Sequence, residues 1–302
     1  MSALWVDTDF GFDDLWAVLL LRQLGAKVAG ISLVAGNAPL PQVTSNALGA
    51  RSAYGIDAPV YSGADHPLVR MQETAERILG PFGMQSRGRR LPEPKEPHSL
   101  PDALPALAKW LDSGAPGEPR EVLALGPLTN IANLTRRAPQ SAAKISRLVW
   151  MGGSAGPGNH SAMAEFNALA DPEAAAVISA ARLPLDVVDL MLCRKITFGP
   201  SDVPVMPPLM ADLIGGYLDI GLSRGRPGMA IYDPVAALAA MRPDLFQFEK
   251  CRMQVSITPD DSYGATAFHS ASEGETRLAT DVTPDMAHIC LTALAEEVAN
   301  ER

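Results

Sequence analysis

Four aspartates, Asp7, Asp9, Asp13 and Asp14, lie within the eight-residue segment DTDFGFDD near the start of the chain. Carboxylates this close repel one another unless a cation or a shared proton offsets their charge. Ca²⁺ and Mg²⁺ prefer oxygen ligands, commonly several carboxylates with carbonyl oxygens and waters. Because Gly11 lets the chain turn between a strand and a helix, Asp9 and Asp14 can point into one site. The segment therefore predicts a metal site, since a helix-capping role would account for only one of the aspartates.

Two other interpretations of the acidic opening predict different chemistry. An EF-hand loop does not fit, because Gly11 comes too early and a predicted strand precedes the motif. A metal-dependent phosphatase also opens with Asp-x-Asp after a strand, and it needs a phosphate-binding loop at a strand end. The segments GPLTN (126–130) and MGGSAGPG (151–158) could supply backbone N–H groups, but neither has an adjacent lysine or arginine. The phosphatase remains an alternative.

Apolar strand-like runs alternate with helix-length segments along most of the chain. This pattern predicts an α/β fold over residues 1–302 as a single domain, with an open, mostly parallel, doubly wound sheet and helices on both faces. A small antiparallel appendix is expected at 251–259 and 263–269, before a C-terminal helix. The other expected strands are 3–9, 27–36, 121–126, 145–153 and 183–190, and the expected helices are 13–24, 41–55, 127–137 and one starting near Asp171.

The polar clusters follow the predicted strands at their carboxyl ends, where the site of an open parallel sheet forms. They are DTDFGFDD, then 36–37, 125–130 and 151–167. Two irregular segments, 80–101 and 221–230, are candidates for mobile lids or ordinary surface connections. We expect the loops 80–101 and 215–232 to set substrate specificity.

Composition and charge limit the possible partners. The chain is 47% hydrophobic and carries a formal net charge of −9, which argues against a nucleic-acid partner and favours a small neutral or cationic substrate. No apolar run reaches the roughly 18 residues that a membrane helix needs. The start lacks a signal-peptide pattern, and the three cysteines form no CxxC pair. These features predict a cytoplasmic protein without a membrane partner.

Six short segments identify a protein family more specifically than composition or charge does. They are DTDFGFDD (7–14), VAGN (34–37), ALGPLTNIA (124–132), VWMGG (149–153), AEFNALADPEAA (164–175) and YDPVAALAA (232–240). The acidic opening is a distinctive motif. Its occurrence together with EFN and DPEAA at compatible spacing is strong evidence for one protein family. By these segments the chain resembles the inosine–uridine preferring nucleoside hydrolase family over nearly its whole length.

The resemblance implies a calcium-dependent enzyme that hydrolyses the N-glycosidic bond of ribonucleosides and forms a homodimer or homotetramer. Ca²⁺ would be held by Asp9, Asp14, Asp233 and the backbone carbonyl of Leu125. Asp9 would also accept a proton from the attacking water, and Asp7 would support the site from behind. The remaining site residues would surround the ribose: Asp13 and Asn167 at the 2′- and 3′-hydroxyls, then Asn37, Asn159 and Glu165, with Met151 against the ring. Carboxylate and amide oxygens suit this reaction, because positive charge builds on the sugar in the transition state.

The sequence departs from the family at the residues expected to act on the departing base. Family members that accept both inosine and uridine carry a histidine that protonates the departing base, and this chain has Tyr232 there. Leu79 replaces a second histidine. A phenol with a pKa near 10 is a poor proton source at neutral pH, but its ring can stack on a base. Tyr232 therefore indicates either a purine preference or a good leaving group such as that of nicotinamide riboside. His160, beside Asn159, is the histidine nearest to the expected cleft, although we expect it to lie on the surface.

Several polar residues also fit plain structural roles. Asp171-Pro172 and Asp233-Pro234 both fit helix starts with an aspartate N-cap. We expect Asp171 to be a cap and Asp233 to be a metal ligand. Asn130 is expected in a helix-capping or turn position. A nucleoside-binding protein without turnover is the alternative to an enzyme, motivated by the missing histidines and opposed by the complete acidic set.

Overall fold

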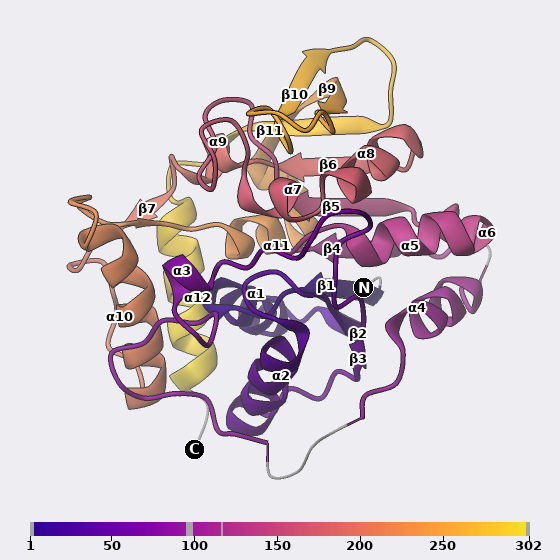
Figure 1. The fold of residues 1–302 in the computed structure, drawn as a ribbon. Helices are drawn as coiled ribbons and strands as arrows, with labels where there is room; N and C mark the ends of the chain where they lie inside the picture. The colour runs from indigo at the N-terminus through magenta and orange to yellow at the C-terminus, as the bar shows by residue number, and fades with distance from the viewer. Residues whose placement is uncertain (1–2, 95–98, 116, 300–302) are drawn as a thin grey trace.

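A computed structural model of the protein describes residues 3–94, 99–115 and 117–299. A nine-stranded sheet forms its centre (Figure 1). From one edge to the other its strands are β10 (Thr266–Ser270), β9 (Phe246–Val255), β11 (Thr276–Val282), β6 (Leu185–Val188), β5 (Arg147–Met151), β4 (Arg120–Ala124), β1 (Ala3–Thr8), β2 (Lys27–Leu33) and β3 (Val60–Ser62). The strands from β11 to β3 pair in parallel, so the predicted mostly parallel sheet is confirmed.

Helices cover both faces of the sheet, as predicted. One face packs against α1 (Phe12–Gln23), α2 (Leu40–Tyr54), α10 (Pro208–Leu222), α11 (Asp233–Met241) and α12 (Met286–Ala299). The other face packs against α4 (Ala103–Asp112), α5 (Thr129–Arg137), α6 (Pro139–Ala142) and α8 (Pro172–Ala180). Figure 1 shows α10 and α12 on the side of α1, away from α4 to α6. The alternation in β1 places Leu4 and Val6 in the first core and Trp5 in the second.

The antiparallel appendix is confirmed, but it is continuous with the main sheet. β9 pairs antiparallel with both β10 and β11, and β11 pairs in parallel with β6. At this junction the buried Asp186 accepts hydrogen bonds from Arg277 Nε at 2.6 Å and from Arg147 Nε at 2.7 Å. Sequence analysis did not predict β11, because its mixed sequence TRLATDV lacks the apolar run of a buried strand.

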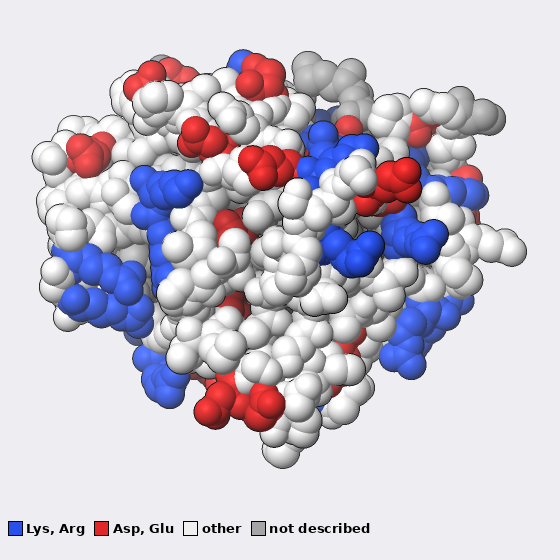
Figure 2. Space-filling view, turned by 90° about the horizontal axis from the view of Figure 1, so that it is seen from above, with Lys and Arg blue, Asp and Glu red and all other residues white. Residues whose placement is uncertain are grey.

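The remaining elements are short. They are α3 (Glu76–Leu79), α7 (Phe166–Ala170), α9 (Leu190–Cys193), a 3₁₀ turn (Pro243–Leu245) and a separate antiparallel pair, β7 (Thr197–Phe198) with β8 (Met229–Ala230). Within the described part of the chain, no helix has both the length and the apolar character needed to cross a membrane. Figure 2 shows basic and acidic side chains interspersed on the face seen from above. The predicted homo-oligomer stays a prediction.

Candidate active site

The acidic opening forms a tight turn between β1 and α1. Phe10, which is buried, adopts a φ of 30°, a left-handed conformation that a bulky residue takes only when its surroundings enforce it. The backbone N–H of Phe10 donates to the Thr8 hydroxyl oxygen at 3.0 Å, and the Thr8 hydroxyl donates to the Asp14 carboxylate. The N–H of Gly11 donates to the other Asp14 oxygen at 2.7 Å. These bonds fix Asp14 in the first turn of α1.

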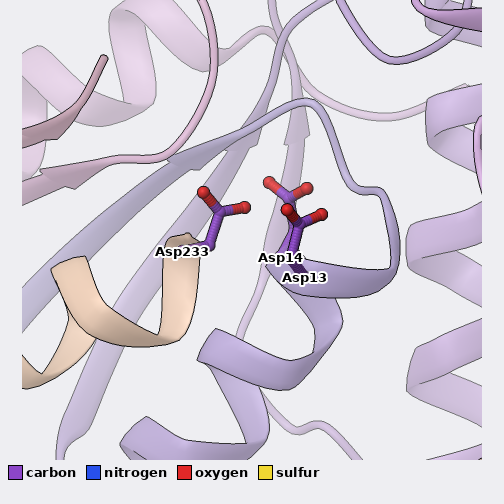
Figure 3. Close-up of side chains that lie close together, drawn as sticks. All are labelled: Asp13, Asp14 and Asp233. Atoms are coloured by element: carbon purple, nitrogen blue, oxygen red, sulfur yellow. The ribbon is translucent and has the colours of Figure 1, made fainter. Parts of the chain in front are cut away.

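Three carboxylates meet where α1 and α11 begin. Asp13, Asp14 and Asp233 each offer one oxygen within 4.8 Å of the others. Figure 3 shows Asp13 and Asp14 on one helix, facing Asp233 on the other. Asp233 is the first residue of α11 and Tyr232 is its N-cap, so Asp233 is not the cap that its position before Pro234 suggested. Its carboxylate points toward α1 instead.

Asp9 lies beside this trio and is 2% exposed. Its Oδ2 accepts a hydrogen bond from the backbone N–H of Asn37 at 2.7 Å. The close approach of the loop after β2 requires Gly36, because a Cβ atom there would overlap the Asp9 side chain. Among the described residues, the set of three oxygens within 4.8 Å contains Asp13 rather than Asp9. The predicted ligand role of Asp9 therefore stays a prediction.

The cluster carries more negative charge than its surroundings balance. Burial and then the charge of Asp14 raise the pKa of Asp9 well above its ordinary value. Burial and then the charge of Asp13 do the same for Asp233, and burial followed by Asp14 raises the pKa of Asp13 to about 7. Within the described ranges, none of these carboxylates forms an ion pair with a lysine or arginine. Buried all-oxygen donors without a counter-charge fit a hard divalent cation.

A pocket of about 260 Å³ opens above the carboxylates. It brings together all the sugar-contacting residues that the resemblance implied, together with Tyr232. The predicted residues that line it are Asp9, Asp13, Asn37, Leu125, Met151, Asn159, Glu165, Asn167, Tyr232 and Asp233. Asp14 lies behind them and is fully buried.

Asn167 joins two strand ends at the pocket floor. Its Nδ2 donates to the carbonyl oxygen of Leu125 at 2.8 Å and to that of Met151 at 2.9 Å. A carbonyl oxygen has two lone pairs, so this bond leaves Leu125 able to ligate a cation. Its ligand role stays a prediction.

Glu165 is buried and caps α7. Its carboxylate accepts hydrogen bonds from the N–H groups of Asn167 at 2.9 Å, Ala168 at 3.1 Å and Gly153 at 2.8 Å. Burial is nevertheless the larger effect and raises the pKa of Glu165 to about 7. Asn159 Oδ1 accepts the N–H of Phe166 at 2.9 Å, which fixes the loop before α7.

A buried network supports the site from behind. Asp7 accepts hydrogen bonds from the Ser32 hydroxyl and, at 2.8 Å, from Asn130 Nδ2. Asn130 also donates to the Leu33 carbonyl oxygen at 3.0 Å and accepts the Ala64 N–H at 2.8 Å. The expectation of a capping or turn role for Asn130 was therefore wrong, because it bridges β1, β2 and the loop after β3. Asp171 is confirmed as the cap of α8, accepting the Ala174 N–H at 3.0 Å.

We expect Asn130→Ala to lower the free energy of unfolding by about 2–3 kcal/mol, because the buried Asp7 carboxylate and the buried Leu33 carbonyl oxygen each lose a hydrogen bond. Denaturant unfolding measures the change. Asn133→Ala in the same helix is the matched control, since no hydrogen bond of the Asn133 side chain occurs among the described residues. Equal, small losses in both variants would contradict the bridging role.

Sequence reasoning missed several residues of the pocket wall. Tyr217 on α10 places its hydroxyl 3.2 Å from Asp13 Oδ2. Arg194, Arg224 and Arg226 also line the pocket. Apart from Arg194, these residues lie in the segment 215–232, which was predicted to set specificity. None of the described residues of 80–101 lines this pocket, and 82–94 instead lines a separate groove of about 700 Å³ against α2.

His160 and Tyr232 complete the wall. His160 was expected on the surface, but its side chain is 4% exposed and its Nε2 bonds to Glu73. This bond ties the loop before α3 to the loop before α7. Burial raises the pKa of Tyr232 to about 12, against the smaller opposing effects of the Arg194 and Arg226 charges. The phenol is therefore neutral, as the sequence suggested.

A model of the inosine-uridine preferring nucleoside hydrolase family matches residues 4–295. The chain belongs to this family. It is 34% identical over 272 residues to the non-specific ribonucleoside hydrolase RihC of Salmonella enteritidis PT4, a match that covers 86% of this chain and 85% of that protein. Membership makes the chain a nucleoside hydrolase, that is, an N-glycosyl hydrolase, rather than a phosphatase.

Solved structures confirm the fold of this nucleoside hydrolase. The purine-preferring ribonucleoside hydrolase from Gardnerella vaginalis superposes with a TM-score of 0.87 at 22% identity, covering 98% of this chain and 99% of that one. An inosine-guanosine nucleoside hydrolase gives a TM-score of 0.84 at 24% identity, covering 98% of each chain.

Proposed function

We propose that this nucleoside hydrolase is a calcium-dependent enzyme that cleaves ribonucleosides to free base and ribose, with a preference for purines. The observation that carries the proposal is the meeting of buried carboxylates from α1 and α11 at the floor of a pocket walled by amide and carboxylate side chains. Asp14, Asp233 and the Leu125 carbonyl would hold the ion, with Asp9 as a further ligand. When bound, Ca²⁺ would supply positive charge that orients a water and the ribose diol and weakly acidifies that water.

The chain's own groups would perform the proton transfer and hold the sugar. Asp9 would accept the proton of the water that attacks the anomeric carbon, and its bond to the Asn37 N–H would fix its orientation. Asp13 would accept a hydrogen bond from a ribose hydroxyl. The Asn167 amide, held by two carbonyl oxygens, would contact the other hydroxyl. Oxygens around the ring would favour the positive charge that the sugar develops.

Two aromatic rings support the purine preference. Tyr232 and Phe166 both line the pocket, and a flat ring can stack on a base. A larger base offers more stacking area, which favours purines over pyrimidines. The neutral Tyr232 phenol can donate a hydrogen bond, but it is not a proton source at neutral pH.

The test is ribose release from a panel of inosine, guanosine, adenosine, uridine, cytidine and nicotinamide riboside, with and without a chelator. We expect release from the purine nucleosides, loss of activity with the chelator and recovery on adding Ca²⁺. Release that is indifferent to the chelator would overturn the calcium dependence. Faster release from uridine than from inosine would overturn the purine preference.

A further inference from the structure

Three arginines line a pocket whose floor is made of carboxylates. Arg194, Arg224 and Arg226 share this pocket of about 260 Å³ with Tyr232. Within the described part of the chain, none of the three forms an ion pair with a carboxylate. Positive charge at the wall is not needed to hold a neutral ribose or a divalent cation, so it indicates a further ligand group.

The three arginine side chains differ in whether hydrogen bonds within the protein already hold them. Arg194 is half-buried and donates to the carbonyl oxygens of Pro157 at 3.2 Å and Gly158 at 2.8 Å. It therefore fixes the loop that carries Asn159. Arg224 and Arg226 lie exposed between α10 and β8, and no hydrogen bond of either side chain occurs among the described residues. Their guanidinium donors are available to a ligand.

Arg226 is the better placed of these two free arginines. It comes six residues before Tyr232, and β8 between them pairs with β7 at Phe198↔Met229 and Thr197↔Ala230. This short pair fixes the end of the segment beside the Tyr232 ring. A guanidinium fork here can bind two acceptors in one plane, such as a carbonyl oxygen and a neighbouring ring nitrogen.

Two electron-rich groups could meet this fork: the carbonyl oxygen of an oxo-base in a ribonucleoside, or the 5′-phosphate of a ribonucleotide. The buried Glu165 carboxyl group and the carboxyl groups of Asp9 and Asp13 stand at the proposed sugar end of the same pocket, where they offer a phosphate no positive partner. A cationic base such as that of nicotinamide riboside would be repelled by the arginines. The charges on the pocket wall therefore favour an oxo-base.

We propose that Arg226 binds a carbonyl oxygen of the nucleobase beside Tyr232 and stabilises the negative charge of the departing base. This inference rests on the proposed function. As the bond between the anomeric carbon and the base nitrogen breaks, its electron pair passes to the base, which leaves as an anion delocalised onto its carbonyl oxygen. The water oxygen bonds to the anomeric carbon and its proton passes to Asp9. That proton then reaches the base through solvent, giving neutral base and ribose.

The variant Arg226→Gln tests this role. We expect kcat/KM for inosine to fall about 10- to 100-fold, the effect of losing one charged hydrogen bond, while kcat/KM for adenosine, whose base lacks the carbonyl, falls less than about threefold. Arg226→Lys keeps the charge and should recover part of kcat. Arg136→Gln, an exposed arginine in the last turn of α5, is the control for loss of charge.

Binding of free hypoxanthine and adenine by calorimetry gives a readout that does not need turnover. We expect Arg226→Gln to weaken hypoxanthine binding at least about tenfold and to leave adenine binding unchanged. Equal losses for both bases, or for both nucleosides, would overturn the proposal, as would faster ribose release from inosine 5′-monophosphate than from inosine. Selective hypoxanthine binding without ribose release from any nucleoside would support the base site and overturn the proposed hydrolysis.

Discussion

Asp9→Asn should lower kcat for inosine by about 10²- to 10⁴-fold, the contribution of a general base in a proton transfer. The Asn37 N–H orients the Asp9 carboxylate at the pocket floor, and the side chain is almost completely buried. Asparagine keeps the shape and an oxygen ligand but cannot accept the proton of the attacking water. Because the water must then lose its proton without a base, the loss should appear in kcat rather than in KM.

Steady-state ribose release measures the effect, and Ca²⁺ binding by calorimetry separates the base role from a ligand role. Calcium affinity within about tenfold of wild type, together with the large loss of kcat, would assign Asp9 to proton transfer. Asp57→Asn, at an exposed aspartate, is the matched control. Full activity of Asp9→Asn with the ion bound would mean that another group accepts the proton.

The floor of the site was predictable from sequence because its residues are placed by regular elements. Asp9 and Asp14 flank a strand-to-helix turn, and Asn167 follows a second strand end; the carboxyl ends of parallel strands meet at one edge of the sheet. Asp233 was assigned to the site only by the family resemblance. Periodicity alone could not have done so, because an aspartate before a proline at a helix start normally caps the helix.

The pocket wall was harder to predict because long-range contacts decide it. His160 looked like a surface residue, yet its partner Glu73 lies 87 positions away in the sequence. Asn130 follows a strand as a turn residue would, but its partners come from β1, β2 and the loop after β3. Arg226 stands in an irregular segment whose composition indicates only a loop. Hydrogen-bond partners of this kind leave no periodic signal in the sequence.

The charge balance of the site explains why the arginines at the wall and the carboxylates at the floor coexist. Asp13, Asp14 and Asp233 gather acidic groups at the proposed ribose end, where the sugar would become positive in the transition state. Arg226 adds positive charge on the side of Tyr232, where the base becomes negative. In the proposed mechanism, a pocket polarised in this way would stabilise both products of bond breaking and so compensate for the missing histidines without a proton donor at Tyr232.

Asp233→Asn should weaken Ca²⁺ binding by at least about 10- to 100-fold. Mutation of residues that only hydrogen-bond to metal ligands already lowers metal affinity by that factor. The variant removes one of the three carboxyl groups whose oxygens meet within 4.8 Å. In the absence of the ion the same change should stabilise the fold, because Asp233 is 3% exposed and faces other carboxylates without a cation. Loss of the Asp233 carboxyl group should therefore weaken calcium binding and stabilise the ion-free fold.

Thermal unfolding with a chelator and with excess Ca²⁺ measures both effects. We expect the variant to melt higher than wild type under chelation and to gain less on adding the ion, since the stabilisation by a ligand rises with the logarithm of its affinity for the native state. Asp244→Asn, which replaces an exposed aspartate paired with Arg242, is the control for loss of charge. An equal gain from Ca²⁺ in variant and wild type would remove Asp233 from the ligand set. The proposed calcium site would then have to be built without α11.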